Sequence, residues 1–409
     1  MLDRDDVRQA IFDQDFGRLF FLVRKWAGIS LSRIAEACDI KSSRVYELAR
    51  GEGSITSLVK IEQIADALRI PGHLLRLAPR SWESTAGYGG LPSGPDPHGL
   101  PVLNAAGGDA YAEAIRATSR RLVVLDNELN GLPVATMAAR AFRSVHRRLG
   151  QGDYEPRYER DIRAAAAELA EVAGWALFDA EKQDAARRFN QEALFLARVS
   201  GDRSIELLIL QNIAMQSGYL RRPREELAIA RSVLEESSLS PRIEAIFRTR
   251  EARGLFALGH ESEGNRKFDH ARSLLQEGEK DGDPFWAWWI VPEEIDGHQG
   301  ISLWRVGRWK DSIPLLERAL NRDARARVGY QNIYSASLLV SLLEARAWKD
   351  AAEIAESIIP AVAETTSLRT LNRLVAAARS GKDLTGAPPN LRDALHSIEE
   401  AIREDPFTL

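Results

Sequence analysis

Side chains that could perform catalysis are present, but their spacing matches no known catalytic arrangement. The seven histidines are scattered along the chain and never stand at the short intervals that hold a metal ion. The phosphate-binding loop GxxxxGK[ST], the dinucleotide motif GxGxxG, the nucleophile elbow GxSxG and the zinc motif HExxH do not occur. We therefore expect a protein that is not an enzyme and that needs neither a metal ion nor a cofactor.

Basic residues are the other group that could do chemistry, and they are unevenly distributed. The whole chain has a formal net charge of −4, whereas the stretch 15–80 holds eleven basic and seven acidic residues. A locally positive segment can bind the phosphates of nucleic acid, and an acidic segment is repelled by them. The charge pattern therefore suits a DNA-contacting head on a larger body that stays away from DNA.

Length and composition limit the class of protein. The chain has 409 residues, 44% of them hydrophobic and 28% charged, which predicts a soluble protein with at least two structural units. It contains no apolar run of membrane-spanning length, and its first residues lack the pattern of a signal peptide, so we expect a cytoplasmic protein. The single cysteine, Cys38, excludes an internal disulfide framework, and its place on an apolar helix face predicts a buried side chain.

The sequence predicts five short helices between residues 15 and 80. Apolar residues at helical spacing form one face of the first helix, which is expected to end at Gly28. Ser30 is expected to cap the second helix, and Asp39 to occupy the turn that follows it. The remaining helices are expected to begin at a cap formed by Ser42 or Ser43, at Thr56 or Ser57, and at Pro71.

Two further regions follow this head. Residues 81–101 are crowded with glycine, proline and serine and lack an apolar period, which predicts a flexible linker. From 102 to 409 the chain is rich in alanine and leucine without strand-like alternation, which predicts helices to the end. The expected organisation is an all-α chain with a head at 1–80, a linker at 81–101 and a helical domain at 102–409.

The helical domain shows internal repetition. Five segments place a small or acidic residue seven positions before an apolar or small one, and the segments are 40, 38, 48 and 39 residues apart. This period is slightly longer than the roughly 34 residues of the tetratricopeptide repeat and predicts antiparallel helix pairs stacked into an α-solenoid. The long step contains an aromatic insertion that includes Trp286. The five pairs are Ala186 and Ala193, Glu226 and Val233, Gly264 and Ala271, Ser312 and Ala319, and Ala351 and Ile358.

The stretch from Phe16 to Pro71 resembles the Xre class of helix-turn-helix domains, the class of Cro and phage repressors. This resemblance implies a five-helix DNA-binding domain whose second motif helix enters the major groove. It also implies a regulator of transcription. The matching positions are Gly28-Ile29-Ser30, Ile34-Ala35, Ile40, Val45, Arg50-Gly51 and Ile64-Ala65-Asp66-Ala67-Leu68.

The resemblance further implies which residues would contact double-stranded DNA. The recognition helix would run from Ser42 to Arg50, and Arg44 would be the best candidate for a base contact. The N-terminus of the next helix would offer backbone N–H groups to a phosphate. The residues expected at the DNA are Lys41, Ser42, Ser43, Arg44, Tyr46, Arg50, Thr56 and Ser57.

The stretch departs from the class at three positions. Glutamine is usual where Leu31 and Ser42 stand, and glycine is usual where Asp39 stands. Asp39 tolerates the left-handed backbone conformation, at some cost, so the turn can still form. The base preference of relatives therefore does not transfer to this chain.

The whole arrangement of head, linker and repeats is similar to a large actinobacterial group of regulators and, more distantly, to peptide-pheromone receptors of Gram-positive bacteria. In those receptors the concave face of the repeats binds an extended peptide, often through asparagine side chains. The resemblance implies an effector in the repeat groove, which would be a peptide, a small molecule or a protein. The residues expected at the effector are Asn212, Gln216, Tyr219, Trp286, Tyr330 and Asn332.

Simpler interpretations of these residues stay open. Each polar member could be an ordinary residue on a solvent-exposed helix. The aromatic cluster at 285–289 has two interpretations, of which we prefer packing of the insertion onto the solenoid to an aromatic wall of a ligand pocket.

Two functions of different classes remain. The first is a transcription regulator that binds a two-fold operator as a homodimer, associates with the nucleoid when bound, and responds to an effector. The second is a scaffold whose repeats hold a partner protein and whose head does not bind DNA.

Overall fold

The structure is a computed structural model of the chain. It describes residues 4–55, 57–68, 109–128, 131–236, 238–276, 282–320, 332–362, 367–382 and 384–403, together with Ile70, Leu75, Gly278 and Lys280.

The chain divides into two compact units. Unit 1 comprises residues 1–99 together with 284–288, and unit 2 comprises residues 100–283 and 289–409. The described residues form nineteen α-helices and no strand, so the predicted all-α fold class is confirmed. The expected linker at 81–101 lies outside the described residues.

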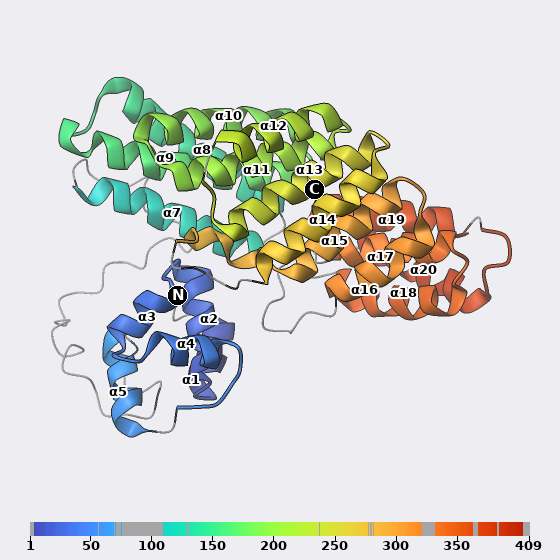
Figure 1. The fold of residues 1–409 in the computed structure, drawn as a ribbon, viewed down its shortest axis with the longest axis horizontal. Coiled ribbons are helices and arrows are strands. Elements are labelled where there is room, and N and C mark those ends of the chain that lie inside the picture. Colours follow the sequence, from blue (N-terminus) through green and yellow to red (C-terminus); the bar gives the residue numbers. More distant parts are fainter. Residues whose placement is uncertain are drawn as a thin grey trace. The chain divides into compact units, whose positions relative to one another are not determined.

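Unit 1 is a small helical domain with one apolar core. Its core draws buried side chains from every helix, among them Val7, Phe20, Ile34, Val45 and Ile64. The sequence analysis missed the first helix, and the expected helix opening at Pro71 lies outside the described residues. The helices, labelled in Figure 1, are α1 (Asp5–Phe12), α2 (Phe16–Ala27), α3 (Leu31–Ala37), α4 (Ser42–Ala49) and α5 (Leu58–Ala67).

Local signals in the sequence fix the turns on either side of α3. Gly28 ends α2 with a left-handed φ of 67°. The backbone N–H of Arg33 donates to Ser30 Oγ at 3.2 Å, which caps α3. Asp39 occupies the following turn with a φ of 50°, and Lys60 Nζ donates to its carbonyl oxygen at 2.6 Å. The predictions for Gly28, Ser30 and Asp39 are confirmed.

The predicted serine cap of α4 is wrong. Lys41 is the N-cap residue, and no side chain accepts a hydrogen bond from the first turn there. Ser42 is already the first helical residue, so the hydroxyl groups of Ser42 and Ser43 stay exposed on the helix surface. Ser57 is the N-cap of α5 as expected, although its side chain makes no capping bond.

Unit 2 consists of helices that follow one another as antiparallel pairs. Nearly all described helices pack against the next described helix along the chain. The helices are α7 (Asp109–Glu128), α8 (Gly131–Gln151), α9 (Glu159–Asp179), α10 (Gln183–Ser200), α11 (Arg203–Tyr219), α12 (Pro223–Glu236), α13 (Pro241–Ala257), α14 (Glu261–Leu275), α15 (Pro292–Arg305), α16 (Trp309–Leu320), α17 (Asn332–Glu344), α18 (Trp348–Val362), α19 (Leu368–Lys382) and α20 (Pro389–Arg403).

The repeated pairs in the sequence mark the second helix of each hairpin. They lie on α10, α12, α14, α16 and α18, and all ten residues are buried. Small side chains at these sites allow each second helix to pack closely on the helix before it. The predicted stack of helix pairs is therefore present.

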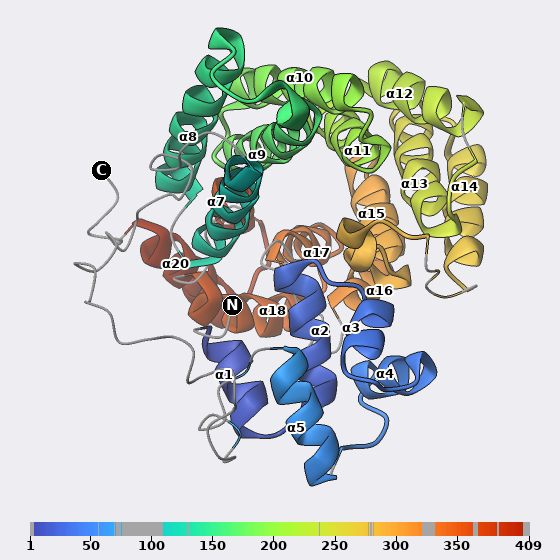
Figure 2. The same ribbon diagram turned by 90° about the vertical axis from the view of Figure 1, so that its left-hand side faces the viewer.

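The helices of unit 2 curve into a ring. Figure 2 shows α9, α11, α13, α15 and α17 on its inner side, with α10, α12 and α14 outside them. Arg369 of α19 donates through Nε to Asp179 Oδ1 of α9 at 2.8 Å, which joins residues 190 positions apart. The end of the array therefore returns to its beginning.

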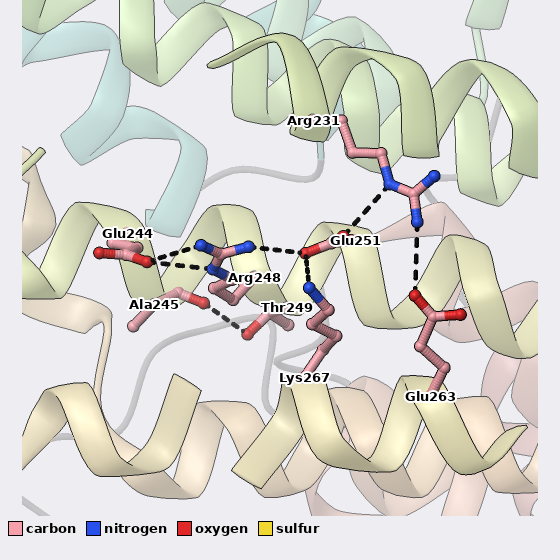
Figure 3. A network of polar contacts seen from close by, with 8 residues as sticks. All are labelled: Arg231, Glu244, Ala245, Arg248, Thr249, Glu251, Glu263 and Lys267. Carbon is pink, nitrogen blue, oxygen red and sulfur yellow. Dashed lines mark hydrogen bonds and ion pairs between the residues drawn. The ribbon is translucent and has the colours of Figure 1, made fainter. Parts of the chain in front are cut away.

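A buried carboxylate ties three consecutive helices of this array together. Figure 3 shows Glu251 of α13 between Arg231 of α12 and Lys267 of α14, at 3.2 Å from each, and Arg248 lies 3.1 Å away. Burial alone would raise the pKa of Glu251, but the hydrogen bonds from Arg248 and Lys267 lower it on balance. The carboxylate is thus held in its charged form.

None of the helices in the described part of the chain combines the length and the apolar character that a membrane crossing requires.

The close crossing of α2 and α4 gives a test of unit 1. A Cβ atom on Gly17 would lie 1.9 Å from the carbonyl oxygen of Leu48, which is backbone and cannot move aside cheaply. Gly17→Ala should therefore destabilise unit 1 by about 2 kcal/mol despite the better helix propensity of alanine. Hydrogen exchange of peptides covering α2 and α4 should show the loss of protection.

Gly150→Ala in α8 is the matched control. Nothing lies within 4 Å of the added Cβ atom there, so the change should stabilise the helix by roughly 0.5–1 kcal/mol. Unchanged protection of α2 and α4 in Gly17→Ala would contradict the close packing.

Candidate nucleic-acid interface and interior polar network

The helix-turn-helix of unit 1 separates buried from exposed residues within one helix. Val45 and Leu48 of α4 are buried in the core, at 0% and 1% exposure. Lys41, Ser42, Ser43 and Arg44 all lie exposed at the N-terminal end of the same helix. The first turn of α4 therefore presents two hydroxyl and two cationic groups to solvent, and groups of these kinds can bind phosphates and base edges.

Arg44 is held by partners within unit 1. Its Nη1 lies 3.0 Å from Glu47 Oε2, and its Nη2 donates to the carbonyl oxygen of Ser54 at 3.4 Å. Both side chains of the ion pair keep about 40% of their exposure, so the pair contributes little to stability. A phosphate or a base edge could replace Glu47 at small cost.

The other residues predicted at the DNA are placed differently. Tyr46 is half-buried against the core, and its hydroxyl lies 3.3 Å from Ser32 Oγ of α3. Arg50 is exposed and paired with Glu52 at 3.2 Å. Ser57 is exposed, and Thr56 lies outside the described residues.

The surface beside the first turn of α4 carries mixed charge. An open depression of about 860 Å³ runs from α3 across α4 to α5. Its charged lining residues are Glu36, Asp39, Lys41, Arg44, Glu47 and Lys60. Acidic and basic groups are equal in number there, so the depression has no strong excess of either sign.

Cys38 lies in the core of unit 1, as the sequence predicts. Its side chain is fully buried, and burial raises the pKa of its thiol to about 11. The thiol therefore stays protonated near neutral pH and behaves as a small apolar group.

Three of the residues expected at the effector are bonded to other side chains or to backbone within unit 2. Asn212 and Gln216 of α11 are buried and bonded within unit 2, to Glu171 and to the carbonyl oxygen of Gln183. Tyr219 donates to Glu181 and packs against Phe178. Asn332 begins α17 and is half-buried.

Two further residues belong to that set, Tyr330 and Trp286. Tyr330 lies outside the described residues. Trp286 belongs to residues 284–288, which cluster with unit 1, where Trp288 packs edge-on against Phe21 at 6.2 Å. The segment is therefore grouped with unit 1, and Trp286 is not grouped with Asn212 and Gln216.

The inner helices of unit 2 share a continuous chain of polar contacts. Tyr334 of α17 donates to Glu294 of α15 at 2.7 Å, and His298 Nε2 lies 3.4 Å from the same carboxylate. Arg250 of α13 then bridges His298, at 3.2 Å, to Gln211 of α11, at 2.8 Å. The chain of contacts thus crosses four inner helices.

The same chain of contacts reaches α9. Gln211 donates to Asn212, and Asn212 Nδ2 donates to Glu171 Oε1 at 2.7 Å. Burial raises the pKa of Glu171 to about 7, while the hydrogen bond from Asn212 lowers it and the nearby Glu168 raises it by a smaller amount. Glu171 is therefore close to half protonated at neutral pH.

The sequence analysis missed the arginines of this interior. Arg250 is 1% exposed and Arg253 is 8% exposed, both on α13. Arginine usually lies on the protein surface, so an arginine-rich helix is predicted to face solvent rather than the interior. The available signal was the segment IFRTREARGLF, in which apolar and charged residues alternate too densely to leave one polar face.

No protein-family model matches the chain, and no curated protein matches it. The described residues also contain no group of three or more histidine, cysteine or acidic side chains that could hold a metal ion.

The raised pKa of Glu171 makes stability depend on pH. A carboxyl whose pKa rises from 4.5 to about 7 on folding stabilises the protein fully below pH 4.5, and this contribution is lost as pH rises through 7. Glu171→Gln keeps a neutral partner for Asn212 at every pH. Its stability relative to the wild type, measured by urea unfolding, should therefore be greater at pH 8 than at pH 5.

Glu353→Gln is the matched control, because it removes a carboxylate from the exposed face of α18. An identical difference between Glu171→Gln and the wild type at both pH values would show that Glu171 does not change its protonation on folding.

Proposed function

We propose that the chain is a sequence-specific DNA-binding regulator of transcription, of the Xre helix-turn-helix class. Unit 1 would bind duplex DNA, and unit 2 would receive the signal that controls binding. The observation that carries the proposal is the first turn of α4, where Lys41, Ser42, Ser43 and Arg44 are exposed together while Val45 and Leu48 anchor the helix in the core.

A recognition helix must be held rigidly by the protein core, while the side chains that contact DNA must be free to bind it. Val45 and Leu48 hold α4 in place, since both are buried in a core shared with α2 and α3. Ser42 and Ser43 have no capping bond to break, so their hydroxyl groups are available to phosphates or bases. Arg44 must leave Glu47, which costs little for an exposed pair.

The regulator would bind a two-fold site as a homodimer. A helix-turn-helix unit of this size reads only one half-site, and two half-sites lie about 34 Å apart, one turn of the duplex. The acidic balance of the chain outside unit 1 keeps unit 2 off the DNA, which leaves unit 2 free for an effector or for the dimer contact.

A second candidate function is an interaction scaffold whose head does not bind DNA. The observation that favours it is the mixed charge beside α4, where Glu36, Asp39 and Glu47 stand next to Lys41, Arg44 and Lys60. A surface of balanced charge suits a protein partner better than a phosphate backbone.

Arg44→Ala tests the proposed function. A bound site is first selected from genomic fragments with the wild-type protein, and its affinity is then measured at several salt concentrations. Loss of one specific arginine contact should weaken that site by about 1–3 kcal/mol, roughly 5- to 150-fold. The affinity for unrelated DNA should fall much less.

Glu47→Gln gives the opposite expectation, because it removes the carboxylate that competes with DNA for Arg44. We expect tighter binding to the selected site. Arg8→Ala on α1 removes the same charge from an exposed position elsewhere in unit 1 and serves as the control. If the wild-type protein selects no site above bulk DNA, the scaffold is the better function.

A further inference from the structure

Five arginines from three helices of unit 2 form a connected group, in which each lies near at least one other. We call them the interior arginine cluster: Arg250 and Arg253 of α13, Arg305 of α15, and Arg369 and Arg373 of α19. Two have a carboxylate partner. Arg253 Nε lies 3.2 Å from Glu226 Oε1, and Arg369 Nε donates to Asp179 at 2.8 Å.

The other three arginines are satisfied only by neutral groups. Arg250 donates to Gln211 and contacts His298, Arg305 donates to the carbonyl oxygen of Gly218 at 3.0 Å, and Arg373 donates to Ser337 Oγ at 2.8 Å. No carboxylate of the described residues lies within ion-pair distance of Arg305 or Arg373. Their charge is therefore not neutralised by a direct partner.

The guanidinium groups of the cluster repel one another. Burial, followed by Arg305 and Arg369, lowers the pKa of Arg373. Burial and Arg253 lower the pKa of Arg305, although Glu226 offsets part of this effect. Guanidinium groups remain charged at neutral pH, so the cluster holds an excess of positive charge in a confined place.

His298 does not relieve this excess, nor does it add to it. Burial and the neighbouring Arg250, Arg253 and Arg305 hold the pKa of His298 well below its usual range. The imidazole is therefore neutral and serves only as a hydrogen-bond partner.

Two of the three arginines without a carboxylate partner, Arg305 and Arg373, can be reached from solvent. Arg305 is exposed, although many protein atoms surround it, and Arg373 is half-buried. Arg373 lies over the ring of Trp304, 4.8 Å from its centroid, which holds the guanidinium plane in place. The Trp304 Nε1 atom is buried and has no acceptor among the described residues. A dissolved anion could therefore meet preorganised donors here.

We propose that Arg305 and Arg373 form a binding site for a small oxyanion, a carboxylate or a phosphate group, carried by the effector of unit 2. Its role as a signal rests on the proposed function, whereas the binding itself does not. A guanidinium group binds either oxyanion through two parallel N–H···O bonds, and these bonds are strong where little water competes. The bound anion would also remove the repulsion within the cluster.

The site is tested on the full chain with two probes, inorganic phosphate and citrate, which separate the phosphate source from the carboxylate source. Thermal unfolding is followed at constant ionic strength, with sodium chloride as the reference for general screening. At least one probe should raise the unfolding midpoint of unit 2 in a saturable manner above the chloride reference. No rise with either probe would overturn the proposal.

Substitutions locate the effect. Arg305→Met and Arg373→Met keep the aliphatic stem and remove the charge, and each should weaken the response to the probe at least tenfold. Arg373→Lys keeps the charge and should retain part of the response. Arg379→Met, on the same helix but 63% exposed and paired with Glu399, is the matched control and should respond like the wild type. A wild-type response in both methionine variants at 305 and 373 would overturn the proposal.

The failure of this site and the failure of the proposed function are distinguishable. Binding of the selected DNA by Arg373→Met without anion reports on unit 1 alone, because the substitution lies in unit 2. If DNA binding is intact and no variant changes the anion response, the oxyanion site is wrong while the regulator stands. If the wild type binds the anion but selects no DNA, the oxyanion site stands while the regulator is wrong.

Discussion

A buried charge is stable only where an opposite charge or a well-placed hydrogen-bond partner lies beside it, and most of unit 2 depends on this constraint. Unit 2 carries Arg250, Glu226 and Glu294 at 2% exposure or less. Removing Glu226 would leave Arg253 charged and desolvated, and removing Arg250 or Glu294 would leave buried polar partners without their hydrogen bonds. The outer helices can tolerate exchange of one apolar residue for another, whereas the inner helices fix the register of one hairpin against the next through specific bonds.

The sequence predicts most of the helical framework, because caps and apolar periods act locally. Gly28, Ser30 and Asp39 fix the turns around α3 through their own backbone preferences. The missed helix α1 had a readable signal, since Val7, Ala10 and Ile11 stand at helical spacing and all three are buried. The predicted serine cap of α4 is wrong because the helix already begins at Ser42, so the N-cap position falls on Lys41.

The candidate sites are harder to predict, because they depend on contacts between residues far apart in the sequence. The exposed first turn of α4 follows from the position of Val45 and Leu48, and the pair of Arg44 with Glu47 has the i,i+3 spacing of neighbours on a helix, so this part of the site is local. Asn212 has an amide suited to a peptide backbone, yet in the fold it bonds to Glu171, 41 positions away. Such bonds form only after the hairpins have stacked.

The contact between Arg369 and Asp179 changes how unit 2 is expected to unfold. An open array of hairpins frays from its ends, because a terminal hairpin has only one neighbour. Here Arg369 near the end of the array is bonded to α9 near its beginning, and its guanidinium group also lies 4.1 Å from the centre of the Phe178 ring. Closing the ring gives the last hairpins a second neighbour. Unfolding of one hairpin then removes packing contacts from the hairpins on both sides of it. Unfolding should therefore be more cooperative than in a linear solenoid of the same length.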